Sequence, residues 1–186
     1  QESMIAGAVT GTRLPERWSN PRDLVDFFDI KSDVEALLKQ NHVFDQYRFV
    51  PAAHPALHPG QCAAIERNGE PVGYIGLLHP RVQKLLDISQ PVYVFELALG
   101  AVVEGELPAF RGVSRFPEVR RDLAVIVDRD LSASTLCETI REAAGCYLVD
   151  LKIFDVYQGK GVEINRKSIA VGLTFRESSR TLTEEE

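Results

Sequence analysis

The stretch FDVYQGKG, residues 154–161, joins two runs whose patterns are typical of β-strands. The first run is Leu148–Val156, and the second is KSIAVGLTF, Lys167–Phe175. Because about ten residues rich in Gly, Lys and Arg separate them, we expect an antiparallel hairpin with a long basic tip. The fold of the C-terminal part of the chain is built outward from this hairpin.

The second strand of the hairpin has two unlike faces. Large apolar side chains alternate with small ones: Ile169, Val171, Leu173 and Phe175 against Ser168, Ala170, Gly172 and Thr174. RRDLAVIVD, residues 120–128, repeats the alternation and puts Ala124 on the less apolar side. We therefore expect one bare sheet face that can accept a flat ligand. With Tyr157 nearby and cations at its rim, such a face suits a nucleic-acid base.

The elements around the hairpin predict a known supersecondary order. Strand, helix, strand and strand are expected over residues 121–127, 132–144, 148–156 and 167–175. Ser132 or Ser134 can cap the helix, and Gly145 is well placed to end it. This order is the first two thirds of a ferredoxin-like split βαβ motif. Thr183 and Glu186 have capping-box spacing, so a further helix is expected to start there, and the motif's closing strand is expected beyond residue 186.

The first half predicts an antiparallel sheet with helices on one side, which makes the chain α+β. Asn68-Gly69 predicts the tight turn of a hairpin over residues 62–76. The other expected elements are strands at 4–11, 44–50 and 91–99, the last buried on both faces, helices at 21–41 and 81–88, and a Pro-rich loop at 53–61. Gly105 and Pro108 mark a linker, which divides the chain into domains 1–107 and 108–186.

Charge is unevenly distributed along the 186 residues. Residues 1–107 carry nine basic and fourteen acidic residues, whereas residues 108–183 carry twelve basic and ten acidic residues. A mildly basic second half on an acidic chain fits a local RNA contact, and we expect no DNA partner. The chain has no apolar run long enough to span a membrane and no leader pattern, so we expect a cytoplasmic protein with no membrane partner.

Chemistry-bearing patterns are scarce. Three cysteines without a Cys-x-x-Cys pair predict reduced, mostly buried thiols rather than disulfides or a zinc site. No nucleophile and base stand at a recognisable spacing, and no Gly-rich phosphate loop is present, so we expect no catalytic residue and no metal site. Two alternatives stay open: a hydrolase or transferase that uses His54 or His79, and a ferredoxin-like regulatory module that binds an amino acid without RNA.

Four motifs in order resemble one family. FPEVRRDLAVIV, FDVYQGKG, RKSIAVGLTF and SSRTLTEEE are similar to the ferredoxin-fold anticodon-binding domain of the bacterial phenylalanyl-tRNA synthetase beta subunit. Upstream, DFFDIKSDVEALL, AHPALHPGQ, VGYIGLLHP and VYVFELAL are similar to the catalytic-like module of the same subunit, which is related to a class II synthetase core. The resemblance covers essentially the whole chain.

The resemblance implies a non-catalytic part of a larger enzyme. Two alpha and two beta subunits would form the synthetase, in which alpha carries the phenylalanine and ATP chemistry. The first domain would be a scaffold against alpha, and the second would bind the anticodon stem-loop of tRNA(Phe). ATP and Mg²⁺ would then belong to the holoenzyme, and this segment itself would hold no cofactor.

The resemblance also implies roles for individual residues. Tyr157 would stack on an anticodon base, in a recess lined by Ala124 and Ser168. Candidates for phosphate contact are Arg115, Arg120, Arg121, Lys160, Arg166, Lys167 and Arg180. Arg121 stands next to Asp122 and can equally form a structural ion pair. The alternative for Tyr157 is a tyrosine packed on the hairpin rim, and without the resemblance the pattern favours Ser168 as a solvent-facing strand serine.

Overall fold

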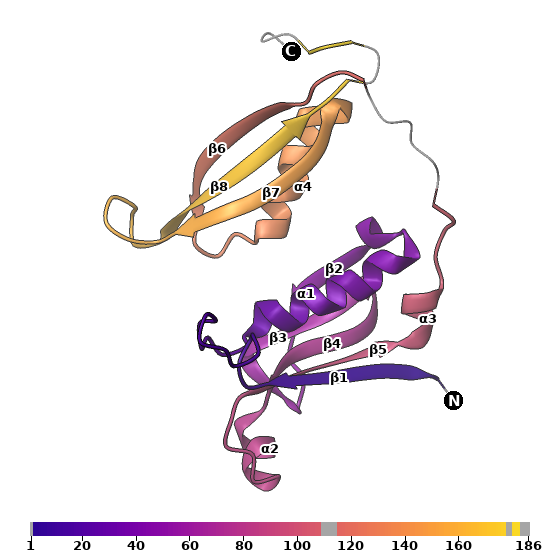
Figure 1. Ribbon diagram of the computed structural model, residues 1–186, viewed down its shortest axis with the longest axis vertical. Coiled ribbons are helices and arrows are strands. Elements are labelled where there is room, and N and C mark those ends of the chain that lie inside the picture. The colour runs from indigo at the N-terminus through magenta and orange to yellow at the C-terminus, as the bar shows by residue number, and fades with distance from the viewer. Residues whose placement is uncertain (1, 109–114, 178–179, 183–186) are drawn as a thin grey trace. The chain divides into compact units, whose positions relative to one another are not determined.

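The chain folds into two compact units, residues 1–109 and residues 110–186 (Figure 1). The computed structural model describes residues 2–108, 115–177 and 180–182. Each unit combines helices with an antiparallel sheet, so the predicted α+β class is confirmed. The boundary predicted between residues 107 and 108 lies two residues from this division. The helix start predicted at Thr183 lies outside the described residues.

The first unit is a five-stranded antiparallel sheet in the order β1-β5-β4-β3-β2. Its strands are β1 (Met4–Thr10), β2 (Tyr47–Pro51), β3 (Leu57–Arg67), β4 (Glu70–Leu78) and β5 (Val92–Ala98). Its helices are α1 (Phe27–Leu38), α2 (Pro80–Leu85) and α3 (Leu99–Val103), with 3₁₀ turns at Lys39–Asn41 and Phe44–Gln46. Figure 1 shows α1 lying across one face of this sheet.

Helix α1 is placed by its apolar stripe and its N-terminal cap. Ile30, Val34 and Leu38 recur every fourth residue, are fully buried and belong to the apolar core of this unit. The predicted start at residue 21 is wrong, because Asp26 accepts hydrogen bonds from the N–H groups of Phe28 and Asp29 and so fixes the first turn there.

Three further expectations in the first unit need correction. The predicted loop over residues 53–61 ends early, because β3 already begins at Leu57 and accommodates Pro59 at a register irregularity before Cys62. Strand β5 is not buried on both faces: Tyr93 and Leu97 are buried, whereas Glu96 is exposed. The linker predicted over residues 101–111 begins inside α3, which ends at Val103. The hairpin turn is confirmed, since Asn68 and Gly69 both adopt positive φ, 53° and 85°.

Asn41 ties the end of α1 to the end of the first unit. Its side-chain amide donates to the Tyr47 hydroxyl at 2.8 Å and to the Ala101 carbonyl at 2.9 Å, and its Oδ1 accepts from Val43 N–H at 3.2 Å. Its backbone carbonyl accepts from Glu106 N–H at 3.0 Å. Among the described residues, Asn41 is the polar residue that is buried, and each polar atom of its side chain has a hydrogen-bond partner.

The second unit is a three-stranded sheet with one helix. Its elements are β6 (Val119–Asp128), α4 (Ala133–Ala144), a 3₁₀ turn Gly145–Tyr147, β7 (Leu148–Tyr157) and β8 (Arg166–Phe175). The strand order is β6-β8-β7 with antiparallel neighbours, which is the order of the first three strands in a ferredoxin-like fold. The predicted caps are confirmed, with Ser132 Oγ accepting from Thr135 N–H at 3.1 Å and Gly145 at φ 66°.

Helix α4 covers one face of this second sheet (Figure 1). The core between them contains Leu136 of α4 and Ile169, Val171 and Leu173 of β8. The register sets Leu123 of β6 beside Val171 on the same face, yet Leu123 remains 44% exposed. No described strand pairs with the outer edge of β6. The side of this sheet away from α4 carries the small residues of β8.

The three cysteines differ in environment, so the prediction that they are mostly buried is wrong: Cys62 is buried, Cys137 is half-buried and Cys146 is exposed. Burial raises the pKa of the Cys62 thiol and of the Cys137 thiol, which leaves less of each as the reactive thiolate at neutral pH.

We expect a disulfide reagent such as 5,5′-dithiobis(2-nitrobenzoate) to modify Cys146 first and Cys62 last, because Cys62 is the least accessible thiol. Raising the pH should speed reaction at Cys62 and Cys137 as their raised pKa values are approached. The measurement is peptide mapping by mass spectrometry after timed labelling. Reaction of Cys62 ahead of Cys146 would contradict the burial order.

Candidate nucleic-acid interface

The side of the second sheet away from α4 presents side chains in four rows, here called the open face. Because antiparallel partners point to the same side, the register defines the rows. From the hairpin tip downward they are Tyr157–Ser168–Ile126, Asp155–Ala170–Ala124, Lys152–Gly172–Asp122 and Asp150–Thr174–Arg120, in the order β7–β8–β6. The central column, which belongs to β8, therefore consists of small residues. The larger side chains of the face belong to β7 and β6 on either side of it.

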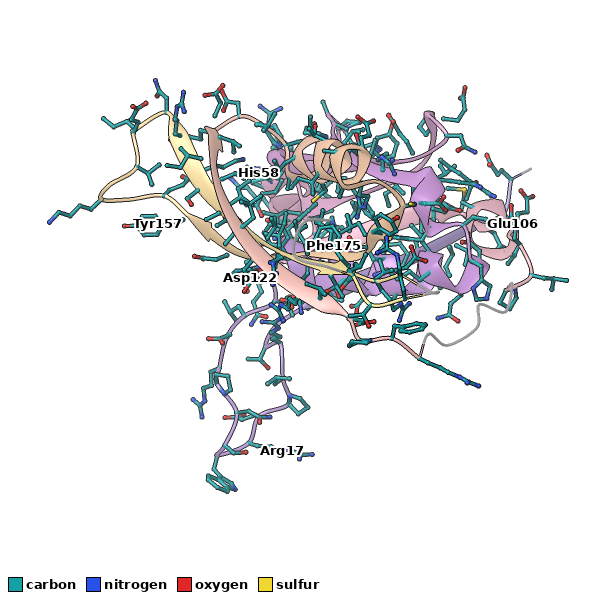
Figure 2. The ribbon with its side chains drawn as sticks, turned by 90° about the horizontal axis from the view of Figure 1, so that it is seen from above. Arg17, His58, Glu106, Asp122, Tyr157 and Phe175 are labelled. Carbon is teal, nitrogen blue, oxygen red and sulfur yellow. The ribbon has the colours of Figure 1, made fainter. Side chains whose placement is uncertain are left out.

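Tyr157 stands at the hairpin end of this face (Figure 2). Its side chain is 45% exposed, and its hydroxyl donates to the Lys160 carbonyl at 3.2 Å. A Cβ added to Gly159 would lie 2.7 Å from the Tyr157 hydroxyl oxygen, so this glycine leaves room for the ring at the tip. The ring is thus held by the hairpin while part of it faces solvent. This geometry is compatible with a tyrosine packed on the hairpin rim and with one that stacks on a base.

Ser168 and Ala124 lie on the same face as Tyr157. Ser168 is the direct partner of Tyr157 on one side and of Ile126 on the other. Ala124 faces Ala170 in the next row, so it is diagonal to Ser168. The three residues that the sequence predicts together are brought together by the sheet. Ser168, Ala170 and Gly172 of β8 form a column of small residues on this face.

A β-bulge in β7 determines which of its side chains lie on the open face. The register shifts between Ile153 and Asp155, leaving Phe154 without a partner. Leu151 and Ile153 face α4, so simple alternation would send Asp155 and Tyr157 to that side as well. The bulge reverses the alternation and brings both onto the open face. Asp155 was missed by sequence reasoning for this reason, whereas Lys152 precedes the bulge and lies on the open face by simple alternation.

The predicted cations separate into two groups. Lys160 lies at the exposed hairpin tip, and Arg166 lies on the open side of β8, where it is 3.5 Å from Glu163 and 3.9 Å from Asp128. Lys167 and Arg121 point to the side that α4 covers, since they pair in register with Val127 and Leu173.

Lys167 and Arg121 each have a local partner. The Lys167 ammonium donates to the Leu131 carbonyl at 2.6 Å, ahead of α4. Arg121 donates to the Arg120 carbonyl at 3.4 Å, and its predicted ion pair with Asp122 is formed instead by Arg120, at 3.3 Å. Neither Lys167 nor Arg121 stands on the face of Tyr157. Arg115 and Arg180 lie outside the three strands.

Three of the first unit's four histidines accept hydrogen bonds from nearby backbone N–H groups. Nδ1 of His54, His58 and His79 accepts from the backbone N–H groups of Ala56, Gly60 and Arg81 respectively, at 3.3, 3.0 and 3.1 Å. His54 also contacts the Tyr74 ring, with centroids 4.9 Å apart. These contacts favour structural roles in turns and a helix cap over the hydrolase alternative.

The described residues lack the features of two other kinds of site. They contain no group of three or more His, Cys, Asp or Glu side chains placed to hold a metal ion. Within the same ranges, no helix is both long enough and apolar enough to cross a membrane.

Two family models match the chain. Residues 1–99 match the model described as the phenylalanyl tRNA synthetase beta chain CLM domain. Residues 114–186 match the ferredoxin-fold anticodon binding domain. The second match covers the unit that carries the open face.

Curated relatives agree with these matches. A phenylalanine-tRNA ligase beta subunit of Pseudomonas fluorescens is 57% identical over all 186 residues, which cover 24% of that relative. The proteins of the same name from Idiomarina loihiensis and Hahella chejuensis are 48% and 42% identical, again over the whole chain and over 23% of each relative. The chain thus spans about a quarter of the length of the curated relatives it matches.

Proposed function

Because the chain belongs to the phenylalanyl-tRNA synthetase beta chain family, we propose that it is the part of a phenylalanine-tRNA ligase beta subunit that binds the tRNA(Phe) anticodon stem-loop and docks to the alpha subunit. The ligase would be a cytoplasmic α2β2 heterotetramer. Residues 108–186 would be the anticodon-binding domain, and residues 1–107 a non-catalytic module related to a class II synthetase core. The regulatory amino-acid module receives no support from the relatives' names.

One observation carries the RNA-binding proposal: Tyr157, Ser168 and Ala124 meet on the open face of a ferredoxin-fold sheet. An unstacked anticodon base can lie on the small residues of β8 with its ring against Tyr157. Base–aromatic stacking is worth about 1–3 kcal/mol per base, so one such contact accounts for a large share of recognition. Substitution of Tyr157 and Ser168 in the complete synthetase, with tRNA kinetics as the readout, tests the proposal.

Charged side chains of β7 lie beside the small residues of β8 on the open face. Asp155 faces the same side one row below Tyr157, and an ionised carboxylate accepts hydrogen bonds from the amino and imino groups on a base edge. Lys152, in the next row, can balance that charge. A base held here would stack on Tyr157 and donate hydrogen bonds to Asp155. The stacking would fix the position of the nucleotide, and the hydrogen bonds would depend on its identity.

Phosphate contact is assigned to the cations on the tip and the open side. Lys160 extends from the exposed tip, and Arg166 is partly neutralised by its exposed acidic neighbours, whose pairing contributes little in water. Lys160 is therefore the leading candidate for a backbone phosphate. Lys167 and Arg121 are assigned to the fold of the unit rather than to RNA.

The described residues do not fit the ATP and Mg²⁺ of the ligase reaction. They offer no cluster of carboxylates or histidines for the ion, and the sequence has no Gly-rich loop for the phosphates. We therefore assign both to the remainder of the holoenzyme. The five-stranded antiparallel sheet with α1 on one face supports a scaffolding role for the first unit.

The 186-residue chain by itself should not activate phenylalanine, because its described residues offer no cluster of groups that could orient ATP and the amino acid. The measurement is phenylalanine-dependent ATP–pyrophosphate exchange, with the complete synthetase as the positive control. Exchange above background by the purified chain, retained after removal of host synthetase by a second affinity step, would overturn the assignment of a non-catalytic module.

A further inference from the structure

The open face carries an arginine whose guanidinium reaches the central strand away from Tyr157. Arg120 of β6 lies in the row of Thr174, and Asp122 lies in the row of Gly172. Arg120 Nε is 3.3 Å from the Asp122 carboxylate. Figure 2 labels Asp122 on β6 and Tyr157 at the hairpin end of the same sheet. The ion pair therefore begins two rows from Tyr157, on the same side of the sheet.

Gly172 makes room for this ion pair. A Cβ added to Gly172 would lie 3.2 Å from Arg120 Nη2, 3.6 Å from Arg120 Nε and 3.3 Å from a carboxylate oxygen of Asp122. Both side chains therefore lean from β6 over β8 instead of pointing away from the sheet. Gly172 is itself buried. Because Gly172 has no side chain, the guanidinium can approach the backbone of the central strand.

Stability alone is a weak reason for this arrangement. The Arg120 and Asp122 side chains are 68% and 55% exposed, and exposed ion pairs contribute little because water screens them. The pair does provide a guanidinium that is oriented by a carboxylate and keeps much of its surface accessible. Planar guanidinium groups stack on nucleic-acid bases as aromatic rings do.

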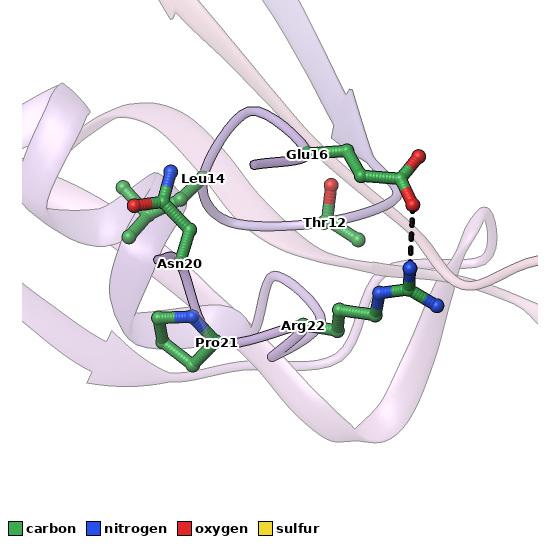
Figure 3. A pocket seen from close by; sticks show the side chains of 6 residues that line it. All are labelled: Thr12, Leu14, Glu16, Asn20, Pro21 and Arg22. Carbon is green, nitrogen blue, oxygen red and sulfur yellow. Dashed lines mark hydrogen bonds and ion pairs between the residues drawn. The ribbon is translucent and has the colours of Figure 1, made fainter. Parts of the chain in front are cut away.

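The ion pair in the pocket of the first unit lies in a different setting. This pocket, of about 250 Å³, is lined by Thr12, Leu14, Glu16, Asn20, Pro21 and Arg22 (Figure 3). Arg22 is 2.7 Å from Glu16, and both belong to the segment between β1 and α1. Nothing in this lining selects one class of ligand. The Arg120–Asp122 pair, by contrast, continues a face of the unit that matches an anticodon binding domain.

We propose that the Arg120 guanidinium is a second stacking platform on the open face, and that it holds an unpaired nucleotide of the anticodon loop other than the one on Tyr157. This inference rests on the proposed function, which supplies the RNA. A strand rises by about 3.4 Å per residue, so Ser168 and Gly172 are about 14 Å apart along β8. One base cannot cover that distance, and RNA-binding sheets stack two or three bases on one face.

The test measures tRNA(Phe) kinetics of the complete synthetase with three substitutions. Arg120→Ala should lower kcat/KM by about 5- to 30-fold and leave phenylalanine activation unchanged. Arg120→Lys keeps the charge but removes the plane, so its loss should approach that of Arg120→Ala. Gly172→Val keeps Arg120 but fills the place of its guanidinium, so it should cause a similar loss. Arg141→Ala is the matched control, because Arg141 is an exposed arginine of α4, on the other side of the sheet.

Transfer RNAs that lack the base at one anticodon-loop position identify the nucleotide that each platform holds. The loss caused by Arg120→Ala should disappear on the tRNA that lacks the base stacked on Arg120. The loss caused by Tyr157→Ala should disappear on a tRNA that lacks a different base. A purely structural effect of either substitution would instead lower the use of all these tRNAs to the same extent.

Several results would overturn the inference. Wild-type kinetics for Arg120→Lys, with a loss for Arg120→Ala, would assign Arg120 to a phosphate. Dependence of the Arg120 and Tyr157 losses on the same missing base would leave a single stacked nucleotide. Wild-type kinetics for Arg120→Ala, with the Tyr157→Ala loss retained, would remove the second platform and leave the proposed function intact. Wild-type kinetics for both substitutions would contradict the proposed function itself.

Discussion

Replacing Tyr157 by Ala in the complete synthetase should lower kcat/KM for tRNA(Phe) by about 5- to 150-fold, which corresponds to about 1–3 kcal/mol of lost stacking. Phenylalanine activation should be unchanged, because the open face contains no residue assigned to that chemistry. The measurement is aminoacylation kinetics over a range of tRNA concentrations, with ATP–pyrophosphate exchange measured on the same preparation.

Tyr157→Phe separates stacking from the hydroxyl contact. It keeps the ring and removes only the hydrogen bond to the Lys160 carbonyl, which is on the surface. Because water can replace this exposed hydrogen bond and the stacking ring is kept, Tyr157→Phe should be close to silent in tRNA kinetics. Equal losses for Tyr157→Phe and Tyr157→Ala would indicate that the hairpin tip, rather than the ring face, is what matters.

Ser168→Trp should impair tRNA use as strongly as Tyr157→Ala, because an indole at Ser168 would occupy the space between Tyr157 and Ile126. Ser134→Trp is the matched control: it makes the same change on the exposed surface of α4, on the other side of the sheet. If Ser168→Trp and Tyr157→Ala both keep wild-type kinetics, the open face is not an anticodon site.

Asn41→Leu should destabilise the first unit by about 2–4 kcal/mol, because Leu has nearly the same volume but cannot make the buried hydrogen bonds. Val43 N–H would lose its acceptor, and the Ala101 carbonyl would keep only the Tyr47 hydroxyl. The measurement is urea unfolding of the 186-residue chain followed by circular dichroism, in which the transition of the second unit serves as an internal reference.

Gln40→Leu provides the control for this change. Gln40 is the neighbouring residue, is exposed, and makes one long side-chain contact to the Ala36 carbonyl at 3.4 Å. The substitution is similar in chemistry and should alter stability by about 0.5 kcal/mol or less. Similar unfolding midpoints for Asn41→Leu and wild type would mean that the buried amide is not a structural anchor.

Local sequence signals predicted the elements that depend on one or two residues. Asn68-Gly69 predicted the hairpin turn because both residues tolerate positive φ, and Ser132 and Gly145 predicted the ends of α4 because capping is a short-range interaction. Alternation in β8 predicted the open face, since a central strand with one covered side repeats every second residue.

The sequence could not predict features that depend on pairing or on tertiary contacts. The bulge at Phe154 changes which side chains of β7 lie on the open face, and the bulge is recognised only from the register of β7 with β8. The role of Lys167 depends on the Leu131 carbonyl, a contact between residues 36 positions apart. The resemblance to a family groups Tyr157 with Ala124 and Ser168, and the register puts all three on one face, whereas alternation along β7 alone would place Tyr157 on the α4 side.

Within the described residues, the outer edge of β6 is paired with no other strand. Backbone N–H and C=O groups that face no described strand are a template for a strand from another copy. Arg120, Arg121 and Asp122 are exposed along β6, and charged side chains on an edge oppose intermolecular sheet growth. Since salt screens such charges, we expect them to oppose pairing at an uncovered β6 edge less strongly at high ionic strength.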